Sequence, residues 1–344
     1  MSISNHDEPF VPFCDGDGVS QPITENDVAH TDACASDPFG AVWQSLPQRM
    51  REKNQVERKT LYLVATPIGN LMDLSLRALK ILREVNFIAA EDTRNTGKLL
   101  TCFGISRPLV SYHEHNKKQS GEQIVRRLAA GESCALVTDA GTPAISDPGA
   151  DLVRLCVEND IAITAIPGCC AAIDALALSG LDTSRFAFEG FLPAAQGAGK
   201  KQLEEVKSEM RTLIFYEAPH RLQRTLSLML EVLGERQVSL CRELTKQYES
   251  IQRVPLSRAV SYYEDHEPRG EYVLVVSGAS KDSVTQNAEW REMSVEEHVE
   301  DYLKKNPDMR KNDAIKAVAR DRGVPKSVIY DQVCGKTAEK KDEP

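Results

Sequence analysis

Hydrophobic and polar positions follow a repeating order between residues 59 and 180. A short apolar run leads into a loop of small or charged residues, and then into a segment whose apolar positions lie three or four residues apart. The first pattern is typical of buried parallel strands and the second of amphipathic helices. The runs predict strands at 61–66, 86–90, 108–111, 134–138 and 161–166. The segments between them predict helices at 73–85, 95–102, 118–130, 147–159 and 169–179. This alternation predicts a mostly parallel, doubly wound sheet.

The pattern changes after the stretch 180–184, where we expect a domain boundary. Further apolar runs predict strands at 185–193, 212–216, 238–243 and 271–277. A charged helix at 200–210 and a longer one that begins after 217 and ends at 233 lie between them. This order favours a mixed sheet in a second domain. The chain is therefore expected to be an α/β protein with domains at 58–182 and 183–280.

Short helices are predicted at 290–335, after a polar linker. Around 322–327 they resemble a helix-turn-helix module. Between 304 and 326 there are eight basic residues against three acids, a local charge of +5. Such a surface would contact phosphates. A packing or dimerisation module with a solvated basic face is an equally open interpretation.

The first 57 residues lack any sustained period and are expected to form a disordered acidic extension. Residues 1–48 hold eight acids and no Lys or Arg, so they account for −8 of the net charge of −9. The rest of the chain is left at −1. The acidic total is therefore no argument against an anionic partner.

Cysteine usage and hydropathy indicate a cytosolic protein without a membrane span. The nine cysteines form no CxxC pair, and several lie in predicted strands or helices, which favours reduced, buried thiols over disulfides or a zinc site. The adjacent Cys169 and Cys170 are read as two small residues where bulk is not tolerated. No apolar run reaches 18 residues, and no basic segment with an apolar core begins the chain.

The predicted site is organised around the stretch 136–149. An apolar strand gives way to a loop of small residues at 139–146, and a helix follows with Asp147 as N-cap and Pro148 at its first position. This geometry lets a backbone approach a ligand closely at the carboxyl end of a sheet. The alternative is an ordinary turn between a strand and a helix.

Four more loops follow predicted strands and should meet the first at one sheet edge. The set is 66–69, 91–94, 112–116, 139–146 and 167–171. Three are small and poor in charge, and two are charged. Since ligands bind at this edge of a parallel sheet, we expect a backbone-lined cofactor slot beside a polar, reactive rim.

Several common sites are excluded by their missing patterns. There is no GxxxxGK[ST], no GxGxxG after a strand and no GxSxG, so nucleoside-triphosphate, nicotinamide and serine-hydrolase chemistry is not expected. His113 and His115 lie two residues apart rather than on one helical face, so no metal site is expected there. A hydrogen-bonding loop at the cleft is the preferred interpretation.

Six motifs together resemble the tetrapyrrole-methylase-like (class III) methyltransferases, and among them the branch of ribosomal RNA small subunit methyltransferase I. They are ATPIGNLMDL at 65–74, AEDTR at 90–94, DAGTPAISDPG at 139–149, FEGFLP at 188–193, FYEAPHR at 215–221 and RELTK at 242–246. The resemblance runs from about Lys59 to Gly278. The helical tail looks like the appendage of that group.

The resemblance implies S-adenosylmethionine as methyl donor and 2′-O-methylation of a cytidine ribose in the decoding region of small-subunit ribosomal RNA, on free RNA or the 30S subunit. It also implies two α/β domains with the cofactor between them, and a homodimer. The residues it places at the cofactor are Pro67, Asp139, Gly141, Thr142, Ile145, Cys170, Ala171 and Tyr216. Cys169-Cys170 departs from the commoner Pro-Ser or Pro-Cys pair.

A ribose hydroxyl is a weak nucleophile, so a base or a polarising cation would help the transfer, and positioning would supply much of the rate. Candidates for these roles are Glu91, Asp92, His113, Glu217 and Lys246. Candidates to hold phosphates or the base are Arg94, Asn116, His220 and Arg221. Each has a structural alternative as an ion pair or helix cap, Asp92 and Glu217 above all.

Two other functions stay open. One is methylation of a tetrapyrrole or another small molecule. That branch usually carries a Gly-Asp-Pro loop, whereas residues 140–143 read Ala-Gly-Thr-Pro, which favours RNA. The other is a non-catalytic RNA-binding assembly protein that keeps the fold, and binding of S-adenosylmethionine would distinguish it.

Overall fold

The computed structural model describes residues 43–195, 197–280, 293–307 and 309–334. They divide into two compact units. One carries both β-sheets. The other holds residues 208–210 and the chain from Gly278 onward.

The first sheet is parallel throughout, as predicted. Its order is β3-β2-β4-β1-β5. The strands are β1 (Thr60–Val64), β2 (Phe87–Ala90), β3 (Leu109–Ser111), β4 (Cys134–Val137) and β5 (Ala162–Ile166). Every residue of β2 and β4 is buried, as expected for strands covered on both faces.

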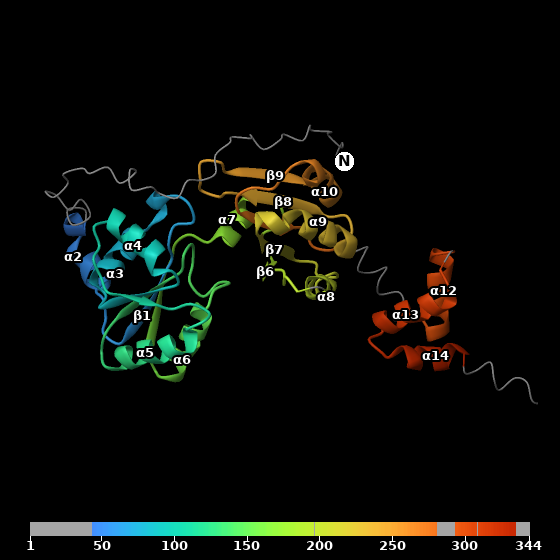
Figure 1. Ribbon diagram of the computed structural model, residues 1–344, viewed down its shortest axis with the longest axis horizontal. Helices are drawn as coiled ribbons and strands as arrows, with labels where there is room; N and C mark the ends of the chain where they lie inside the picture. The colour runs from blue at the N-terminus through green and yellow to red at the C-terminus, as the bar shows by residue number, and fades with distance from the viewer. Residues whose placement is uncertain (1–42, 196, 281–292, 308, 335–344) are drawn as a thin grey trace, which may run out of the picture. The chain divides into compact units, whose positions relative to one another are not determined.

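Helices cover both faces of this sheet (Figure 1). They are α3 (Leu76–Glu84), α4 (Thr93–Cys102), α5 (Lys117–Ala129) and α6 (Gly149–Glu158). Ile81 of α3 and Leu100 of α4 belong to one apolar cluster. Ile124 of α5 and Leu152 of α6 belong to the cluster on the other face. The doubly wound arrangement is therefore confirmed.

The helix expected from Asp73 begins later. Leu71–Asp73 form a 3₁₀ turn, η1, and α3 starts at Leu76. The Ser75 hydroxyl accepts from the Ala78 N–H at 3.1 Å. A serine cap at this position outweighs the helical spacing of the residues before it.

The second sheet is mixed, as predicted, with the order β6-β7-β10-β8-β9. Its strands are β6 (Phe186–Phe191), β7 (Thr212–Glu217), β8 (Gln237–Arg242), β9 (Ser250–Pro255) and β10 (Tyr272–Val276). The strands β6 and β7 run parallel, and the other neighbouring pairs are antiparallel.

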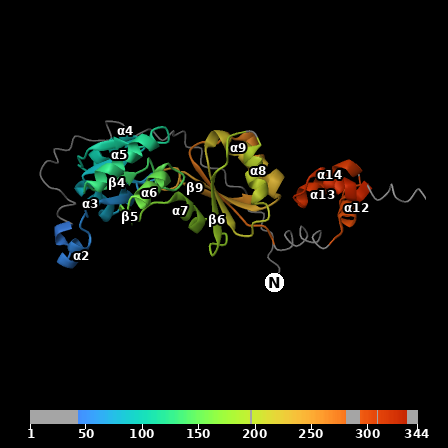
Figure 2. The same ribbon diagram turned by 90° about the horizontal axis from the view of Figure 1, so that it is seen from below.

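The two faces of this sheet are covered from different parts of the chain. Helices α8 (Ala198–Glu205), α9 (Pro219–Leu233) and α10 (Leu256–Asp265) pack on one face. Helix α7 (Ala171–Leu178), which follows β5 of the first sheet, packs on the other. Figure 2 shows α7 and the pair α8–α9 on opposite sides of the strands. Thus α7 joins the two halves of the unit.

The predicted boundary at 180–184 falls between α7 and β6. Both sheets belong to one compact unit, so domains at 58–182 and 183–280 stay a prediction.

Three elements were missed. The strand β9 and the helix α10 were not expected, and α2 (Gln48–Lys53) lies inside the stretch predicted to be disordered, which is wrong for those six residues. Residues 1–42 lie outside the described part of the chain. The helix expected at 200–210 is α8 and ends at Glu205.

The second unit contains the three short helices that the pattern predicted. They are α12 (Val295–Lys305), α13 (Lys311–Asp321) and α14 (Lys326–Cys334). Val299, Ile315 and Ile329 meet in its core. In the described part of the chain, no helix is both long and apolar enough to cross a membrane.

Candidate cofactor site

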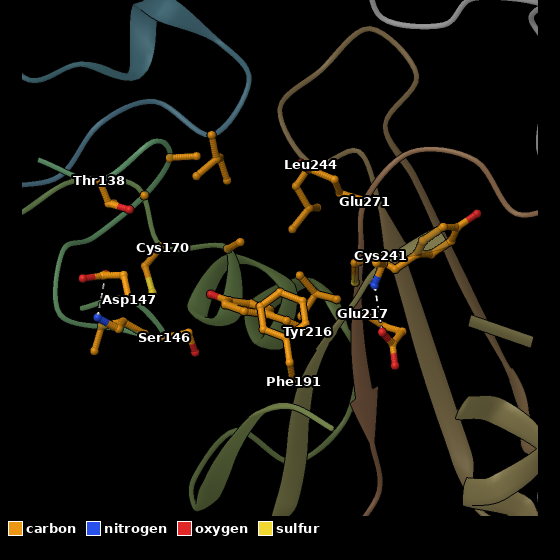
Figure 3. Close-up of a pocket in the computed structure, with 18 of the residues that line it drawn as sticks. Thr138, Ser146, Asp147, Cys170, Phe191, Tyr216, Glu217, Cys241, Leu244 and Glu271 are labelled. Carbon is orange, nitrogen blue, oxygen red and sulfur yellow. Dashed lines mark hydrogen bonds between the residues drawn. The ribbon is translucent and has the colours of Figure 1, made fainter. Parts of the chain in front are cut away.

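A cavity of about 540 Å³ opens at the carboxyl edge of the first sheet and is closed by the second. We call it the cofactor cavity. Figure 3 shows Thr138, Asp147 and Cys170 on one side of it and Leu244 and Glu271 on the other. Tyr216 and Phe191 are drawn between these two sides. Both halves of the first unit therefore build this site.

Hydrogen bonds tie three strand-end loops together on the first side. Thr66 and Gly141 exchange backbone bonds, with N···O distances of 2.9 and 3.1 Å. The Thr142 hydroxyl donates to the Cys169 carbonyl at 2.8 Å. The loops after β1, β4 and β5 thus form one connected wall, as the strand-end pattern predicted.

The backbone conformation of this wall favours glycine at position 141. Its φ is +84°, a left-handed conformation that side chains disfavour. A Cβ there would stand 3.4 Å from Ile68 Cγ2 and 3.7 Å from the Cys169 carbonyl oxygen. Backbone, rather than side chain, therefore faces the cavity at this point.

The rest of the loop is strained and held by one carboxylate. Ala144 and Ser146 have φ of 69° and 64°, which costs of the order of 1–3 kcal/mol per residue. Asp147 Oδ1 accepts from the N–H groups of Ala144 (3.0 Å) and Gly149 (2.7 Å), and Oδ2 from that of Ile145 (3.2 Å).

The expected cap of α6 is wrong by one residue. Pro148 is the N-cap and α6 begins at Gly149, whereas Asp147 was expected to cap and Pro148 to be the first helical residue. The Asp147 carboxylate still accepts from the first N–H of the helix. It also binds the loop behind it, and this double role moves the start of the helix.

Tyr216 forms the apolar floor between the two sides. Its hydroxyl accepts from the Ala172 N–H at 3.2 Å, at the start of α7. Its ring makes edge contacts with Phe188 and Phe191, with centroids 5.0 and 5.5 Å apart. Burial raises the pKa of Tyr216 to about 12, so the hydroxyl is neutral at physiological pH.

Lys246 contributes a fixed positive charge to the cavity. Its Nζ lies 2.9 Å from both Glu243 Oε1 and Glu271 Oε2. Burial lowers the pKa of Lys246, but the hydrogen bonds to Glu271 and Glu243 outweigh it and raise the pKa overall. Of the two roles considered for this residue, the geometry favours the polarising cation over the base.

The loop that carries Lys246 is in direct contact with the loop that follows β1. The Asn70 N–H donates to the Thr245 hydroxyl at 3.1 Å. A Cβ at Gly69 would overlap the Lys246 side chain. The two halves of the unit are thus in contact on this side of the cavity.

Glu91 is the acid of the predicted catalytic set that lines the cavity and, among the described residues, has one carboxylate oxygen without a hydrogen-bond partner. Its Oε2 accepts from the Thr138 hydroxyl at 2.8 Å. Glu217 also lines the cavity, but its side chain has no exposed surface. The Glu217 carboxylate accepts from the Ala218 N–H (2.9 Å) and the Thr225 hydroxyl (2.5 Å), and is therefore committed to the start of α9.

Asp92 and Arg94 pair with each other outside the cavity lining. Asp92 is the N-cap of α4 and accepts from the Arg94 N–H at 2.8 Å. The Arg94 guanidinium hydrogen-bonds the same carboxylate and holds the pKa of Asp92 at about 2. Asp92 therefore caps a helix, which is the structural alternative that the sequence had left open for it.

His113 and Asn116 form a turn of their own after β3. Asn116 Oδ1 accepts from the His113 N–H at 2.8 Å, and its Nδ2 donates to the Ser111 carbonyl at 3.1 Å. Neither residue lines the cavity. Their contacts are those of a hydrogen-bonding loop.

Six of the eight predicted cofactor residues line the cavity: Gly141, Thr142, Ile145, Cys170, Ala171 and Tyr216. Pro67 does not, and its neighbour Ile68 does. The Asp139 carboxylate instead accepts from the Asp92 N–H (3.2 Å) and Asn95 Nδ2 (3.3 Å). Lining residues outside the predicted loops and site residues include Phe191, Leu244, Glu271 and Val273.

The lining suits a cofactor with a flat ring and a charged end. The volume lies within the range of roughly 300–1,000 Å³ found for ligand sites. Phe191, Tyr216 and Leu244 offer apolar surface for a ring, the Gly141 loop offers backbone, and Glu91 and Lys246 offer charges. A phosphate cradle is not required by such a ligand.

Comparisons with known proteins give consistent matches. The family model described as "Tetrapyrrole (Corrin/Porphyrin) Methylases" matches residues 60–260. The "Ribosomal RNA small subunit methyltransferase I" of Halalkalibacterium halodurans is 50% identical over 274 residues, which cover 80% of this chain and 94% of that protein. The protein of the same name from Bacillus subtilis is 45% identical, covering 83% and 98%. Among solved structures, the uroporphyrin-III-C-methyltransferase of Thermus thermophilus aligns with 63% of this chain and 94% of its own, at 18% identity and a TM-score of 0.47.

Proposed function

The chain belongs to the tetrapyrrole methylase family, and we propose that it transfers a methyl group from S-adenosylmethionine to small-subunit ribosomal RNA. Methyltransferases of this family use S-adenosylmethionine as the donor. The observation that carries the proposal is the cofactor cavity, whose backbone-rich loop and aromatic floor are built from the motifs on which the family resemblance rests.

We further propose that the acceptor is a cytidine ribose 2′-oxygen. The relatives are named for small-subunit ribosomal RNA, and the loop Ala140–Pro143 lacks the Gly-Asp-Pro sequence of the small-molecule branch. A ribose hydroxyl also suits a site in which a carboxylate, Glu91, and an ammonium group, Lys246, line the same cavity.

Different residues of the cofactor cavity bind the cofactor and position the acceptor in this reaction. Gly141, Thr142, Cys170 and Tyr216 hold the cofactor, which when bound supplies a methyl group on a sulfonium. The cavity positions the acceptor oxygen, and positioning of this kind supplies much of the acceleration in methyl transfer.

Glu91 and Lys246 act on the acceptor hydroxyl. Glu91 Oε2 is occupied by Thr138, which leaves Oε1 to accept the 2′ proton. The Lys246 ammonium, fixed by two carboxylates, polarises the hydroxyl or offsets the charge of a nearby phosphate.

Two further properties belong to this proposal. We expect the protein in the cytoplasm, where ribosomal subunits are its substrate. We also expect a homodimer, as the family resemblance implies. Large apolar side chains at Met72, Leu76 and Ile173 are exposed in the single chain, which is compatible with a second copy covering them.

The deciding experiment combines a binding and a transfer assay. Calorimetry should detect S-adenosylmethionine binding to the full chain. Labelled methyl should pass to small ribosomal subunits that lack the modification, and label should be sought in parallel on free RNA and on tetrapyrrole precursors. Cofactor binding without label in either RNA sample would refute the RNA proposal, and absence of cofactor binding would refute both enzyme functions.

A further inference from the structure

A second cavity, of about 580 Å³, borders the cofactor cavity. It lies between the loop that follows β6, the start of α8 and one side of α9 from His220 to Glu231. The residues that matter here are Pro193, Gly199, Lys200, His220, Arg221 and Arg224. We call it the α8–α9 cavity. His220 lines both cavities, so a chain lying in one would continue into the other.

The charged side chains that line the α8–α9 cavity are mostly basic. Lys200, Arg221 and Arg224 face a single acid, Glu231. Lys200 pairs with Glu231, and about half of each side chain is exposed. An exposed pair of this kind contributes little to stability, so Lys200 can exchange Glu231 for another anion at small cost.

Arg221 fixes the wall of the cavity. Its Nη2 donates to the Leu192 carbonyl, and its Nε lies 3.3 Å from Glu217 Oε1. The guanidinium thereby ties the end of β6 to the start of α9. One wall of the cavity is thus fixed by contacts between the end of β6 and the start of α9.

Arg224 and His220 are the side chains placed to meet a ligand. They are four residues apart on α9, on one face of the helix and about 6 Å apart along its axis. Both are exposed. Among the described residues, neither has a hydrogen-bond or ion-pair partner, whereas a guanidinium fork is well suited to phosphate oxygens.

The start of α8 adds to the positive potential. Gly199 is buried, and a Cβ there would stand 3.3 Å from the Pro193 carbonyl oxygen and 3.7 Å from Leu228 Cδ2. The first turn of α8 therefore packs closely beneath the loop. Gly197 is the N-cap of α8, and no side chain caps it, so the positive end of the helix dipole faces this side.

We propose that the α8–α9 cavity binds backbone phosphates of the RNA strand next to the nucleotide whose ribose enters the cofactor cavity. The inference rests on the proposed RNA methyltransferase function and names a surface that delivers the substrate. Charge complementarity and the border shared at His220 carry it. In this arrangement Arg224 binds a phosphate, Arg221 holds the wall, and His220 marks the passage between the two cavities.

The test compares two exposed arginines. In the full chain, Arg224→Gln removes the proposed phosphate contact. Arg126→Gln is the matched control, because Arg126 lies exposed on α5 and lines neither cavity. The probe is a fluorescein-labelled single-stranded RNA of the decoding-region sequence, titrated at several salt concentrations. Binding of S-adenosylmethionine is measured separately by calorimetry.

We expect Arg224→Gln to weaken RNA binding about fivefold, the equivalent of one exposed charge pair. The slope of log affinity against log salt should fall by about 0.7, the value for one phosphate contact to a single strand. Arg224→Glu should weaken RNA binding further, and S-adenosylmethionine affinity should not change. Equal RNA affinity and salt slope in the Arg224 and Arg126 variants would overturn the proposal.

The outcomes separate this inference from the function on which it rests. A wild-type chain that methylates RNA, with no difference between the two arginine variants, keeps the function and removes the phosphate site. A chain that shows the expected loss of affinity at Arg224 but transfers no methyl group keeps the site and removes the function.

Discussion

At the scale of single residues, four of the six non-glycine residues with positive φ in the described part of the chain lie at or next to the loops of the cofactor cavity, and Lys59 and Asp160 lie elsewhere. Gly141, Ala144 and Ser146 have positive φ on one side, and Glu243 and Thr245 on the other. Strained residues persist where the surrounding structure fixes them, and they often mark ligand sites. Here the fixing contacts are the Thr66–Gly141 bridge and the Asp147 carboxylate.

Replacement of Gly141 by Ala tests the need for backbone at the cavity wall. The left-handed φ and the contact with Ile68 should cost about 1–2 kcal/mol of folding free energy. Displacement of the loop should weaken S-adenosylmethionine binding about tenfold, by the relation of about 1.4 kcal/mol to a factor of ten. Calorimetry and thermal unfolding would measure both effects.

Gly97→Ala is the matched control for that substitution. Gly97 lies inside α4, and a Cβ there would meet only Leu109 Cδ1, at 3.9 Å. Alanine should stabilise a helix interior by about 0.5–1 kcal/mol relative to glycine. If Gly141→Ala behaves like Gly97→Ala, the wall does not depend on the left-handed backbone.

Asp147 should be more sensitive to alanine than to asparagine. Asp147→Ala removes three hydrogen bonds from the loop, and loss of a bond to a charged group costs about 1.5–3 kcal/mol. We expect S-adenosylmethionine affinity to fall by more than tenfold. Asp147→Asn keeps the oxygen that binds Ala144 and Gly149, so its loss should be intermediate. Equal affinity in all three proteins would show that the loop is held by other contacts.

At the scale of elements, most strands and helices that show an apolar period were predicted, whereas β9, α10 and α2 were not. The segment Ser250–Pro255 alternates weakly and is mostly half-buried. It becomes β9 because β8 offers it a pairing edge. The six residues of α2 are largely charged or polar, so no pattern distinguished them from the acidic extension. For β9 and for α2, the interactions that decide the secondary structure lie outside the segment itself.

The candidate site, too, was predicted from the sequence only in part. Residues at the ends of parallel strands could be assigned to one sheet edge, and the loops after β1, β4 and β5 do meet there. Leu244 and Glu271 flank antiparallel strands of the second sheet. No sequence rule places them at the cavity, because that requires the position of one sheet against the other.

The helices α12 and α13 should lose stability in acid because of His298. This side chain is 2% exposed, Arg322 Nε donates to its Nδ1 at 3.3 Å, and its Nε2 lies 3.6 Å from Asp321 Oδ2. Burial lowers the pKa of His298 and outweighs the opposing effect of Asp321. Below the ordinary value of 6.5, His298 therefore binds a proton in the unfolded chain but not in the folded chain. The free energy of unfolding should consequently decrease as the pH is lowered below 6.5.

Hydrogen exchange of the full chain would measure this effect. Amides of α12 and α13 should be less protected at pH 5.5 than at pH 7.5, after correction for intrinsic exchange rates. The variant His298→Gln lacks the titrating group and should show a smaller difference. A wild-type difference no larger than that of the variant would contradict the assignment.

At the scale of the whole molecule, charge and chemistry are distributed between units. All residues that line the cofactor cavity lie at or before Val273, in the first unit. The sequence between 304 and 326 carries a net +5, whereas α12 holds four acids of its own, Glu296, Glu297, Glu300 and Asp301. The basic surface of the second unit is therefore concentrated on α13 and the start of α14.

Deletion of residues 290–344 should separate RNA binding from cofactor binding. The cofactor cavity keeps every lining residue, so S-adenosylmethionine affinity should not change. The loss of basic side chains should raise the KM for ribosomal subunits and lower the salt dependence of RNA binding. In the full-length chain, Lys311→Gln with Lys316→Gln should reproduce part of the effect, because both side chains are exposed on α13. Unchanged turnover on RNA in the deletion variant would instead favour a packing or dimerisation role for the helical unit, which sedimentation of the same variant would reveal.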